Sequence, residues 1–221
     1  MIGRTNCGAG GSRAIVVSLH GACSATVSIT GAATASLLLD AAGNGSIILE
    51  EGNYTFTDSV SEYSVQQAIT ESTDVNIWPA GKTMLYWYGR EFDELTGGWS
   101  SVGVQSQAAY PAGGTATKLT NSMTIRAASG KSCGFATNNP VAAGSQITFR
   151  GKTSSNYLYY GVSTDKSSLQ TTRVTATENS FTNSATVVDT VISFASNESG
   201  YPAFFNYGGN YLGTVFAAWI E

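Results

Sequence analysis

The chain changes character at Met84-Leu-Tyr-Trp-Tyr-Gly-Arg-Glu-Phe-Asp-Glu-Leu-Thr-Gly-Gly-Trp99. Just before this stretch, Trp78-Pro79-Ala80-Gly81-Lys82 interrupts a strand pattern, because proline removes a backbone donor from the ladder and glycine loosens the chain. After it, aromatic residues become dense and the strand patterns lengthen. We therefore predict two domains, at residues 14–80 and 84–221. Recognition by shape is expected in the second.

Composition predicts a protein built of many short strands. Of the 221 residues, 42% are hydrophobic and only 12% are charged, against about 25% charged in an ordinary soluble domain. The polar surface must therefore come from Ser, Thr, Asn and Gly, which favour turns over helices, Thr apart. An even distribution of Val, Ile, Leu, Tyr and Phe argues against intrinsic disorder.

Charge and hydropathy exclude several classes of partner. A net charge of -4 and a pI near 5.0 give no basic surface for a phosphate backbone, so no nucleic-acid partner is expected. No apolar run approaches a membrane span, so we expect no membrane insertion. Residues 1–13 lack the apolar centre of a secretory signal, which predicts a chain that is not Sec-exported.

The three cysteines, Cys7, Cys23 and Cys133, are too few and too scattered for a disulfide framework or a metal knuckle. Small buried or half-buried thiols are the expectation. An intermolecular bond, or one between Cys7 and Cys23, stays open.

Residues 14–80 show short strand patterns separated by turn signals, at a spacing typical of a small antiparallel sandwich. The expected strands are Ala14–Leu19, Ala25–Ile29, Ala35–Leu39, Ser46–Leu49, Tyr54–Val60, Tyr63–Ile69 and Val75–Trp78.

From Leu85 onward, roughly ten strand patterns indicate a jelly-roll-type sandwich with very little helix. The expected strands are Leu85–Tyr88, Trp99–Val104, Met123–Ala127, Gly134–Ala136, Gln146–Arg150, Tyr157–Val162, Leu169–Ala176, Thr186–Phe194, Ala203–Tyr207 and Leu212–Ile220. The last two are predicted to form a hairpin across Gly208-Gly209-Asn210. Leu212–Ile220 is apolar on both faces, so we expect it in the middle of its sheet, beside a strand from early in the domain.

Residues that could carry out catalysis are sparse. His20 is the only histidine, which leaves no support for a Ser-His-Asp or zinc site. Glu91, Asp93 and Glu94 cluster near tryptophans, and strand alternation would place Glu91 and Asp93 on one face. Such carboxylates are candidates for glycoside hydrolysis, which needs two of them across the bond that is cut. A solvated acidic loop, or a calcium-holding one, explains the cluster equally well. We predict no cofactor, no metal and no enzymatic activity.

Aromatic residues suggest a binding role. Tyrosine and tryptophan rings stack on sugar faces in β sandwiches, although the same residues also fill such cores. The tyrosines expected to be exposed for a glycan are Tyr110, Tyr157, Tyr159 and Tyr201.

The N-terminal arm, residues 1–13, has little to bury and several glycines. It would become ordered when a neighbour supplies a pairing edge, which makes Arg4, Thr5, Asn6 and Cys7 candidates for an assembly arm. An ordinary frayed terminus is the alternative.

Two resemblances add to these predictions. The run Ser46-Ile-Ile-Leu-Glu-Glu-Gly-Asn-Tyr-Thr-Phe56 resembles the transthyretin-like or carboxypeptidase-regulatory-like group of immunoglobulin-like domains, which implies an Ig-like β-sandwich that serves as a spacer. The start, Met1-Ile-Gly-Arg-Thr-Asn-Cys-Gly-Ala-Gly-Gly11, resembles structural proteins of phages and prophages of gut Firmicutes, as do Leu85–Glu91, Thr96–Trp99, Tyr201–Gly209 and Ala217–Glu221. Cys7 departs from the small residue usual at its position.

The phage resemblance implies a virion location and a tail- or baseplate-associated structural protein. Its partners would be other virion proteins, further copies in a homo-oligomer, and a host-surface glycan bound with multivalent strength. A capsid decoration protein is one alternative, and a carbohydrate-binding module or carbohydrate-active enzyme is another.

Overall fold

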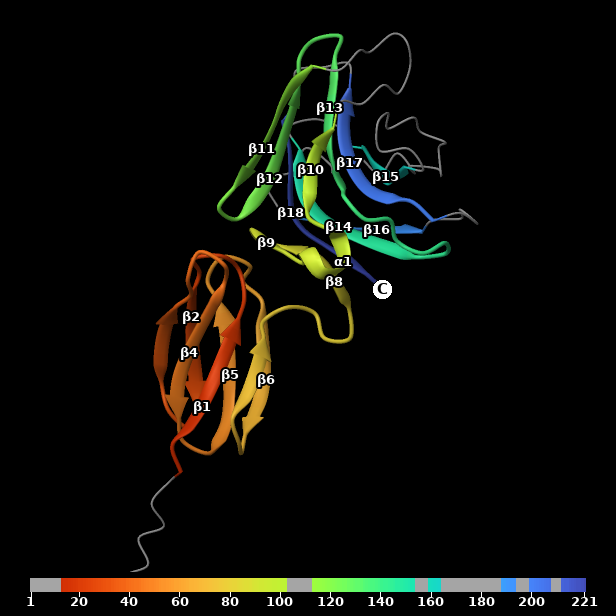
Figure 1. Cartoon of the computed structure of the whole chain (residues 1–221). Helices are drawn as coiled ribbons and strands as arrows, with labels where there is room; N and C mark the ends of the chain where they lie inside the picture. Colours follow the sequence, from red (N-terminus) through yellow and green to blue (C-terminus); the bar gives the residue numbers. More distant parts are fainter. Residues whose placement is uncertain (1–12, 103–112, 154–158, 164–187, 194–198, 208–211) are drawn as a thin grey trace, which may run out of the picture.

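The computed structural model describes residues 13–102, 113–153, 159–163, 188–193, 199–207 and 212–221. Within them the chain forms β-strands and one four-residue helix, α1 (Asp93–Thr96). Two sandwiches stand end to end, and the first described residues lie at the end of the smaller one that faces away from the larger (Figure 1). The predicted all-β class, a small Ig-like sandwich followed by a larger jelly-roll-type one, is confirmed.

The first sandwich consists of two facing sheets, in the orders β4-β1-β7 and β3-β2-β5-β6. Every second residue of the first strand, Ile15, Val17 and Leu19, is buried, because alternate side chains of a strand point to the same face. The strands of this sandwich are β1 (Ile15–His20), β2 (Thr26–Gly31), β3 (Ala35–Leu38), β4 (Asn44–Leu49), β5 (Gly52–Asp58), β6 (Ser64–Ile69) and β7 (Thr73–Asn76).

The second sandwich also has two sheets. One has the order β10-β13-β17-β15, and the other has the order β11-β12-β18-β14-β16, with β8 and β9 attached through β18. Its strands are β8 (Thr83–Trp87), β9 (Arg90–Glu91), β10 (Trp99–Val102), β11 (Gly114–Leu119), β12 (Ser122–Ala127), β13 (Ser132–Thr137), β14 (Gln146–Thr153), β15 (Tyr159–Ser163), β16 (Val188–Ser193), β17 (Tyr201–Tyr207) and β18 (Leu212–Ile220).

Strand β18 confirms one prediction and corrects another. It lies between β12 and β14, is buried on both faces, and pairs with the early strand β8, as its apolar pattern predicts. The expected hairpin with β17 is wrong, because β17 pairs with β13 and β15 in the opposite sheet. Glycines permit a tight turn, but they permit a crossing between sheets equally well.

Strand β11 was not predicted. It forms the edge of its sheet and pairs only with β12 along the described chain. Almost all of its side chains are exposed, including Leu119 at 52%. Because neither face of β11 is buried, its sequence does not alternate between large apolar and polar residues, and this alternation is the pattern that predicts a strand.

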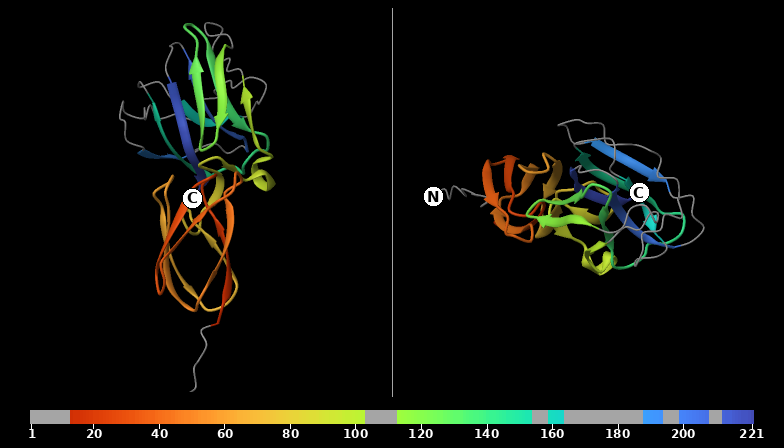
Figure 2. Two further views of the ribbon diagram at one scale, coloured as in Figure 1. Left: turned by 90° about the vertical axis from the view of Figure 1, so that its left-hand side faces the viewer. Right: turned by 90° about the horizontal axis from the view of Figure 1, so that it is seen from above.

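The two sandwiches share an apolar junction. Met84, Trp87, Tyr88, Ala217 and Trp219 belong to the same buried cluster as the core of the first sandwich. The Trp87 ring lies edge-on to Tyr63, which follows β5, and its centroid lies 6.5 Å from that of Trp219 on β18. Burial of these side chains stabilises the junction, and the left view of Figure 2 shows the two sandwiches one above the other.

Backbone contacts also cross the junction. The backbone N–H of Cys23 donates to the Tyr88 carbonyl at 3.0 Å, and the side-chain amide of Asn121 donates to the Cys23 carbonyl at 2.6 Å. Gly89 follows with a φ of +96°, and a Cβ there would lie 1.8 Å from the Thr120 carbonyl oxygen. Only glycine fits this close approach.

The end of the described chain returns to the junction, where Glu221 pairs with Lys82 and accepts hydrogen bonds from Thr148 Oγ1 at 2.5 Å and Trp219 Nε1 at 3.1 Å. Lys82 first, and then Thr148 and Trp219, hold the pKa of Glu221 below its ordinary value of 4.5. Its contacts tie the linker to β14 and β18.

This arrangement predicts acid-sensitive stability. A lowered folded-state pKa contributes stability above the unfolded pKa, and that contribution is lost as pH falls through the folded value. The melting temperature of Glu221→Gln should lie below that of the wild type at pH 7, and the gap should narrow as the pH falls below about 4.5, the ordinary pKa of this glutamate. Thermal melts from pH 3 to 8 measure it, with the exposed Glu51→Gln as control. A gap that does not narrow between pH 7 and pH 3 would contradict the assignment.

Candidate functional site

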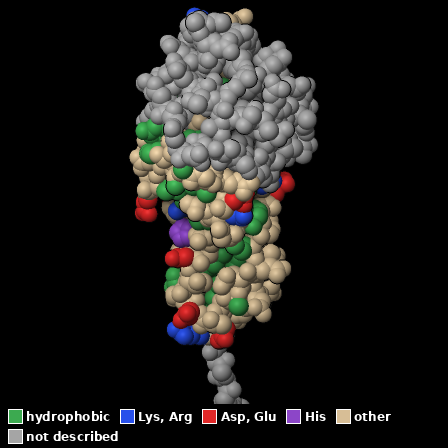
Figure 3. All heavy atoms as spheres, turned by 90° about the vertical axis from the view of Figure 1, so that its right-hand side faces the viewer, with side chains coloured by type: hydrophobic (Ala, Val, Ile, Leu, Met, Phe, Trp, Pro, Cys, Tyr) green, Lys and Arg blue, Asp and Glu red, His purple; other side chains and the backbone are tan. Residues whose placement is uncertain are grey.

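A cleft of about 460 Å³ opens beside the junction, between the linker and the segment that follows β8. It falls in the size range of small-ligand sites, which are mostly apolar with a few convergent polar groups. Figure 3 shows hydrophobic side chains running up the first sandwich to the junction, where charged side chains stand beside them. The lining residues are Trp78, Lys82, Thr83, Met84, Arg90, Glu91, Phe92, Asp93, Glu94 and Leu95.

Two aromatic rings form the apolar part of the cleft. Trp78 and Phe92 are each half-buried and meet edge to face, with centroids 5.3 Å apart. The Arg90 guanidinium carbon lies 5.5 Å from the Trp78 centroid and 5.6 Å from that of Phe92. Cation–π attraction to both rings therefore fixes their positions.

Arg90 is itself anchored in the first sandwich. Its Nη1 donates to the carbonyls of Ala42 and Gly43 at 3.2 and 3.4 Å and to Asn44 Oδ1 at 2.7 Å. Burial lowers the pKa of Arg90, while Cys23 and Asp40 act in the opposite direction. The guanidinium remains charged at neutral pH, because the pKa of an arginine lies far above neutrality.

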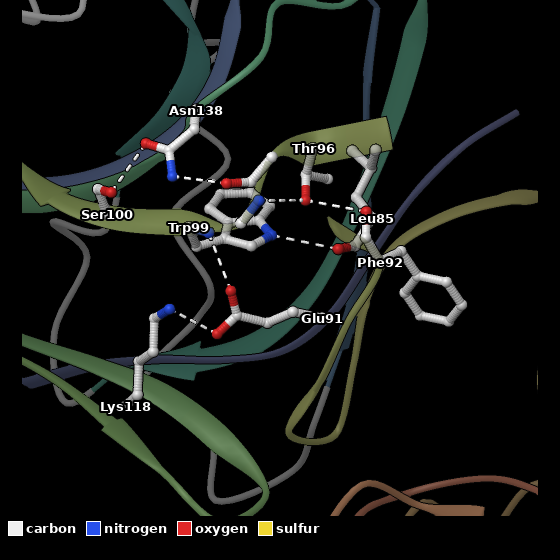
Figure 4. A network of polar contacts seen from close by, with 10 residues as sticks. Leu85, Glu91, Phe92, Thr96, Trp99, Ser100, Lys118 and Asn138 are labelled. Atoms are coloured by element: carbon white, nitrogen blue, oxygen red, sulfur yellow. Dashed lines mark hydrogen bonds and ion pairs between the residues drawn. The ribbon is translucent and has the colours of Figure 1, made fainter. Parts of the chain in front are cut away.

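The carboxylate of Glu91 holds neighbouring strands of the second sandwich together (Figure 4). One carboxylate oxygen accepts the Trp99 backbone N–H at 2.9 Å, and the other pairs with Lys118 Nζ at 2.5 Å. The Trp99 indole donates to the Leu85 carbonyl. This network ties β9 to β10 and β11, and the Phe92 ring points away from it.

The acidic cluster does not lie along one strand face, and its exposed members agree with the alternative of a solvated loop. Glu91 ends β9, whereas Asp93 and Glu94 begin α1 and are exposed, so Glu91 and Asp93 do not share a strand face. Phe92 accepts hydrogen bonds from the backbone N–H and the hydroxyl of Thr96, and Gly97 ends the turn with φ +62°. Strand alternation fails here because this local turn replaces the extended chain.

Of the four tyrosines expected to meet a glycan, the structure describes Tyr159 and Tyr201, and neither lines this cleft. Tyr110 and Tyr157 lie outside the described residues, as do Arg4, Thr5, Asn6 and Cys7. Tyr159 begins β15, and Tyr201, partly buried against Ala203 and Phe205, begins the neighbouring antiparallel strand. Tyr159 lies opposite Phe205 in this ladder, and Tyr201 lies opposite Ser163. The two tyrosines are therefore four residues apart along the ladder.

Sequence reasoning did not predict Trp78, Arg90 or Phe92 as site residues. It placed Trp78 at the end of the expected strand Val75–Trp78, where the proline–glycine break begins, and Phe92 inside the acidic run. A tryptophan next to a domain boundary is the signal that could have found the site, because ligand clefts often lie between domains.

The histidine and the two described cysteines contact other protein groups and do not line the cleft. His20 Nδ1 lies 2.8 Å from Asn44 Oδ1, and Nε2 lies 3.8 Å from Asp74. Cys23 and Cys133 are buried free thiols, and burial raises the pKa of each. Cys7, the other cysteine of the bond left open, lies outside the described residues. Among the described residues, no three His, Cys, Asp or Glu side chains could hold a metal ion.

No helix in the described part of the chain is long and apolar enough to cross a membrane.

No protein-family model and no curated protein sequence match the chain. Among solved structures, a mutant family 29 carbohydrate-binding module is 14% identical, covers 64% of this chain and 92% of its own, and has a TM-score of 0.44. A second mutant, complexed with mannohexaose, has 13% identity, coverages of 65% and 93%, and a TM-score of 0.43. A DUF3823 family protein from Parabacteroides merdae has 11% identity, coverages of 95% and 96%, and a TM-score of 0.29.

Because these TM-scores are all below 0.5, no function is transferred from these proteins. Their descriptions also give no support to the phage resemblance of the sequence.

Proposed function

We propose that this chain is a non-catalytic carbohydrate-binding protein and that the junction cleft holds the sugar. The observation that carries the proposal is the lining of the cleft. It contains the rings of Trp78 and Phe92, the guanidinium of Arg90, and the exposed carboxylates of Asp93 and Glu94. Apolar ring faces pack against the C–H faces of a pyranose, and charged planar groups bind its hydroxyls in pairs. The cleft offers both kinds of contact within about 460 Å³.

A hydrolase is the second candidate, because three carboxylates line the same cleft. Glycoside hydrolysis needs one carboxyl on each side of the bond. Both oxygens of Glu91 are already engaged, and Asp93 and Glu94 are successive residues of one helical turn, so they approach from one wall. Binding without turnover fits this arrangement better.

The test of binding compares three full-length variants on a glycan array and by calorimetry with the best ligand. Trp78→Ala should weaken binding about tenfold, because it removes one stacking ring worth about 1.4 kcal/mol. Asp93→Asn, which alters an exposed side chain without touching the fold, should weaken it less. Leu38→Ala, on an exposed strand of the first sandwich, should bind as the wild type does.

Two outcomes would remove the proposal. The absence of binding to any neutral, acidic or amino glycan would exclude a carbohydrate ligand. Release of reducing ends, abolished by Glu91→Gln or Asp93→Asn, would establish the hydrolase.

The place of the chain in a phage particle stays a prediction, with its virion partners and homo-oligomer. A glycan-binding tail protein and a capsid decoration protein are both compatible with the proposed cleft. Mass spectrometry of purified particles from a lysogen that carries the gene would test the virion location directly.

A further inference from the structure

We infer that the turn between β3 and β4 sets the shape of the junction cleft through Arg90, so that the first sandwich is part of the binding site and not a spacer. The inference rests on the proposed function for its ligand. Its structural half, the control of the Trp78 ring by Asn44 through Arg90, is tested without a ligand.

The turn is held rigidly. Asp40 Oδ1 accepts the backbone N–H groups of Ala42 and Asn44, both at 2.8 Å, and the Asp40 carbonyl accepts that of Gly43 at 3.0 Å. Gly43 has a φ of +77°, and a Cβ there would lie 2.3 Å from the Gly21 carbonyl oxygen. Such a turn aims its carbonyls in fixed directions.

Three oxygens of this turn accept hydrogen bonds from one nitrogen of the second sandwich. Arg90 Nη1 reaches the carbonyls of Ala42 and Gly43 and, at the shortest distance, Asn44 Oδ1. The Asn44 oxygen also faces His20 Nδ1 on β1, which holds the amide in place. The guanidinium therefore takes its position from the first sandwich, although β9 belongs to the second.

Trp78 is positioned by the first sandwich as well. The Ile77 N–H donates to the His20 carbonyl at 2.8 Å, which extends the ladder between β1 and β7 by one residue. Ile77 is fully buried, and Trp78 comes directly after it. The two cleft rings thus come from different sides of the junction, Trp78 from the first sandwich and Phe92 from the second, and Arg90 lies against both.

A ligand that contacts both rings must therefore stabilise the contact between the two sandwiches. Any change that loosens this contact must in turn weaken binding of the ligand. This reciprocity follows from thermodynamic linkage. It makes Asn44, which does not line the cleft, a positioning residue for binding.

The experiment uses four full-length variants: Asn44→Ala, Asn44→Asp, Arg90→Lys and, as control, the exposed Ser36→Ala. Losing a hydrogen bond from a charged donor should weaken glycan binding about tenfold in Asn44→Ala. Asn44→Asp keeps an oxygen acceptor and should retain binding, whereas Arg90→Lys keeps the charge but loses the planar fork and should resemble Asn44→Ala.

A second readout needs no ligand. Of the four tryptophans, Trp87, Trp99 and Trp219 are 0%, 2% and 6% exposed, so acrylamide quenching of fluorescence reports mainly on the half-buried Trp78. Quenching should rise in Asn44→Ala and Arg90→Lys and stay at the wild-type level in Asn44→Asp and Ser36→Ala.

The outcomes separate the two proposals. If no glycan binds but quenching follows this order, the proposed function fails and the control of Trp78 by the first sandwich stands. If a glycan binds and Asn44→Ala changes neither its affinity nor the quenching, the inference is overturned and the proposed function stands. A rise in quenching that leaves affinity unchanged also overturns the inference.

Discussion

Trp87→Ala is expected to lower the free energy of unfolding by about 4 kcal/mol, because a large buried ring is replaced by a cavity. Trp87 is 0% exposed and contacts Tyr63 of the first sandwich and Tyr88 and Trp219 of the second. Its removal should therefore act on the junction more than on either core. Urea titration and calorimetry would measure the change, and we expect the single melting transition to broaden or split as the sandwiches uncouple.

A matched variant separates the ring from its polar atom. Trp87 Nε1 has no hydrogen-bond partner among the residues that the structure describes. Trp87→Phe keeps an aromatic ring and removes an unsatisfied donor, so it should cost far less than Trp87→Ala. Equal losses in the two variants would show that the packing seen at the junction does not account for the stability.

Asp58→Ala is expected to cost about 3 kcal/mol, because it leaves buried backbone donors without an acceptor. Asp58 is fully buried at the end of β5. One carboxylate oxygen accepts the Ala22 N–H at 2.7 Å, and the other accepts those of Val60 and Ser61 at 2.8 and 2.9 Å. It joins the turn after β5 to the segment after β1.

The control for Asp58 is Asp40→Ala. Asp40 accepts two backbone N–H groups of its own turn in the same way, but it is exposed, so water can replace it. The stability loss should be much smaller than for Asp58→Ala in chemical denaturation at neutral pH. A comparable loss in both variants would mean that burial does not set the cost of the missing acceptor.

Much of the local structure follows from sequence pattern, because it depends on neighbours along the chain. Alternation places Ile15, Val17 and Leu19 on one face of β1. Apolar side chains on both faces place β18 inside its sheet. Low charge and abundant turn formers predict an all-β protein. These features are set by side-chain direction and burial, which a strand fixes residue by residue.

Other features depend on contacts that sequence proximity does not record. The chain between β17 and β18 could equally turn back within one sheet or cross to the other, and only the packing of the second sandwich selects the crossing. The acidic run Glu91–Glu94 is read as extended until the Thr96 hydrogen bonds to Phe92 close a turn. Neither choice is visible in residue pattern alone.

The sequence by itself determined the fold class, because strand alternation and turn-forming residues are local properties of the chain. Tertiary structure decided the site, which is lined by Trp78, Arg90 and Phe92. Arg90 donates to Asn44, which lies 46 residues earlier in the chain, at the end of the turn after β3. A guanidinium is positioned by whatever oxygens surround it in space, and those oxygens belong to a different sandwich.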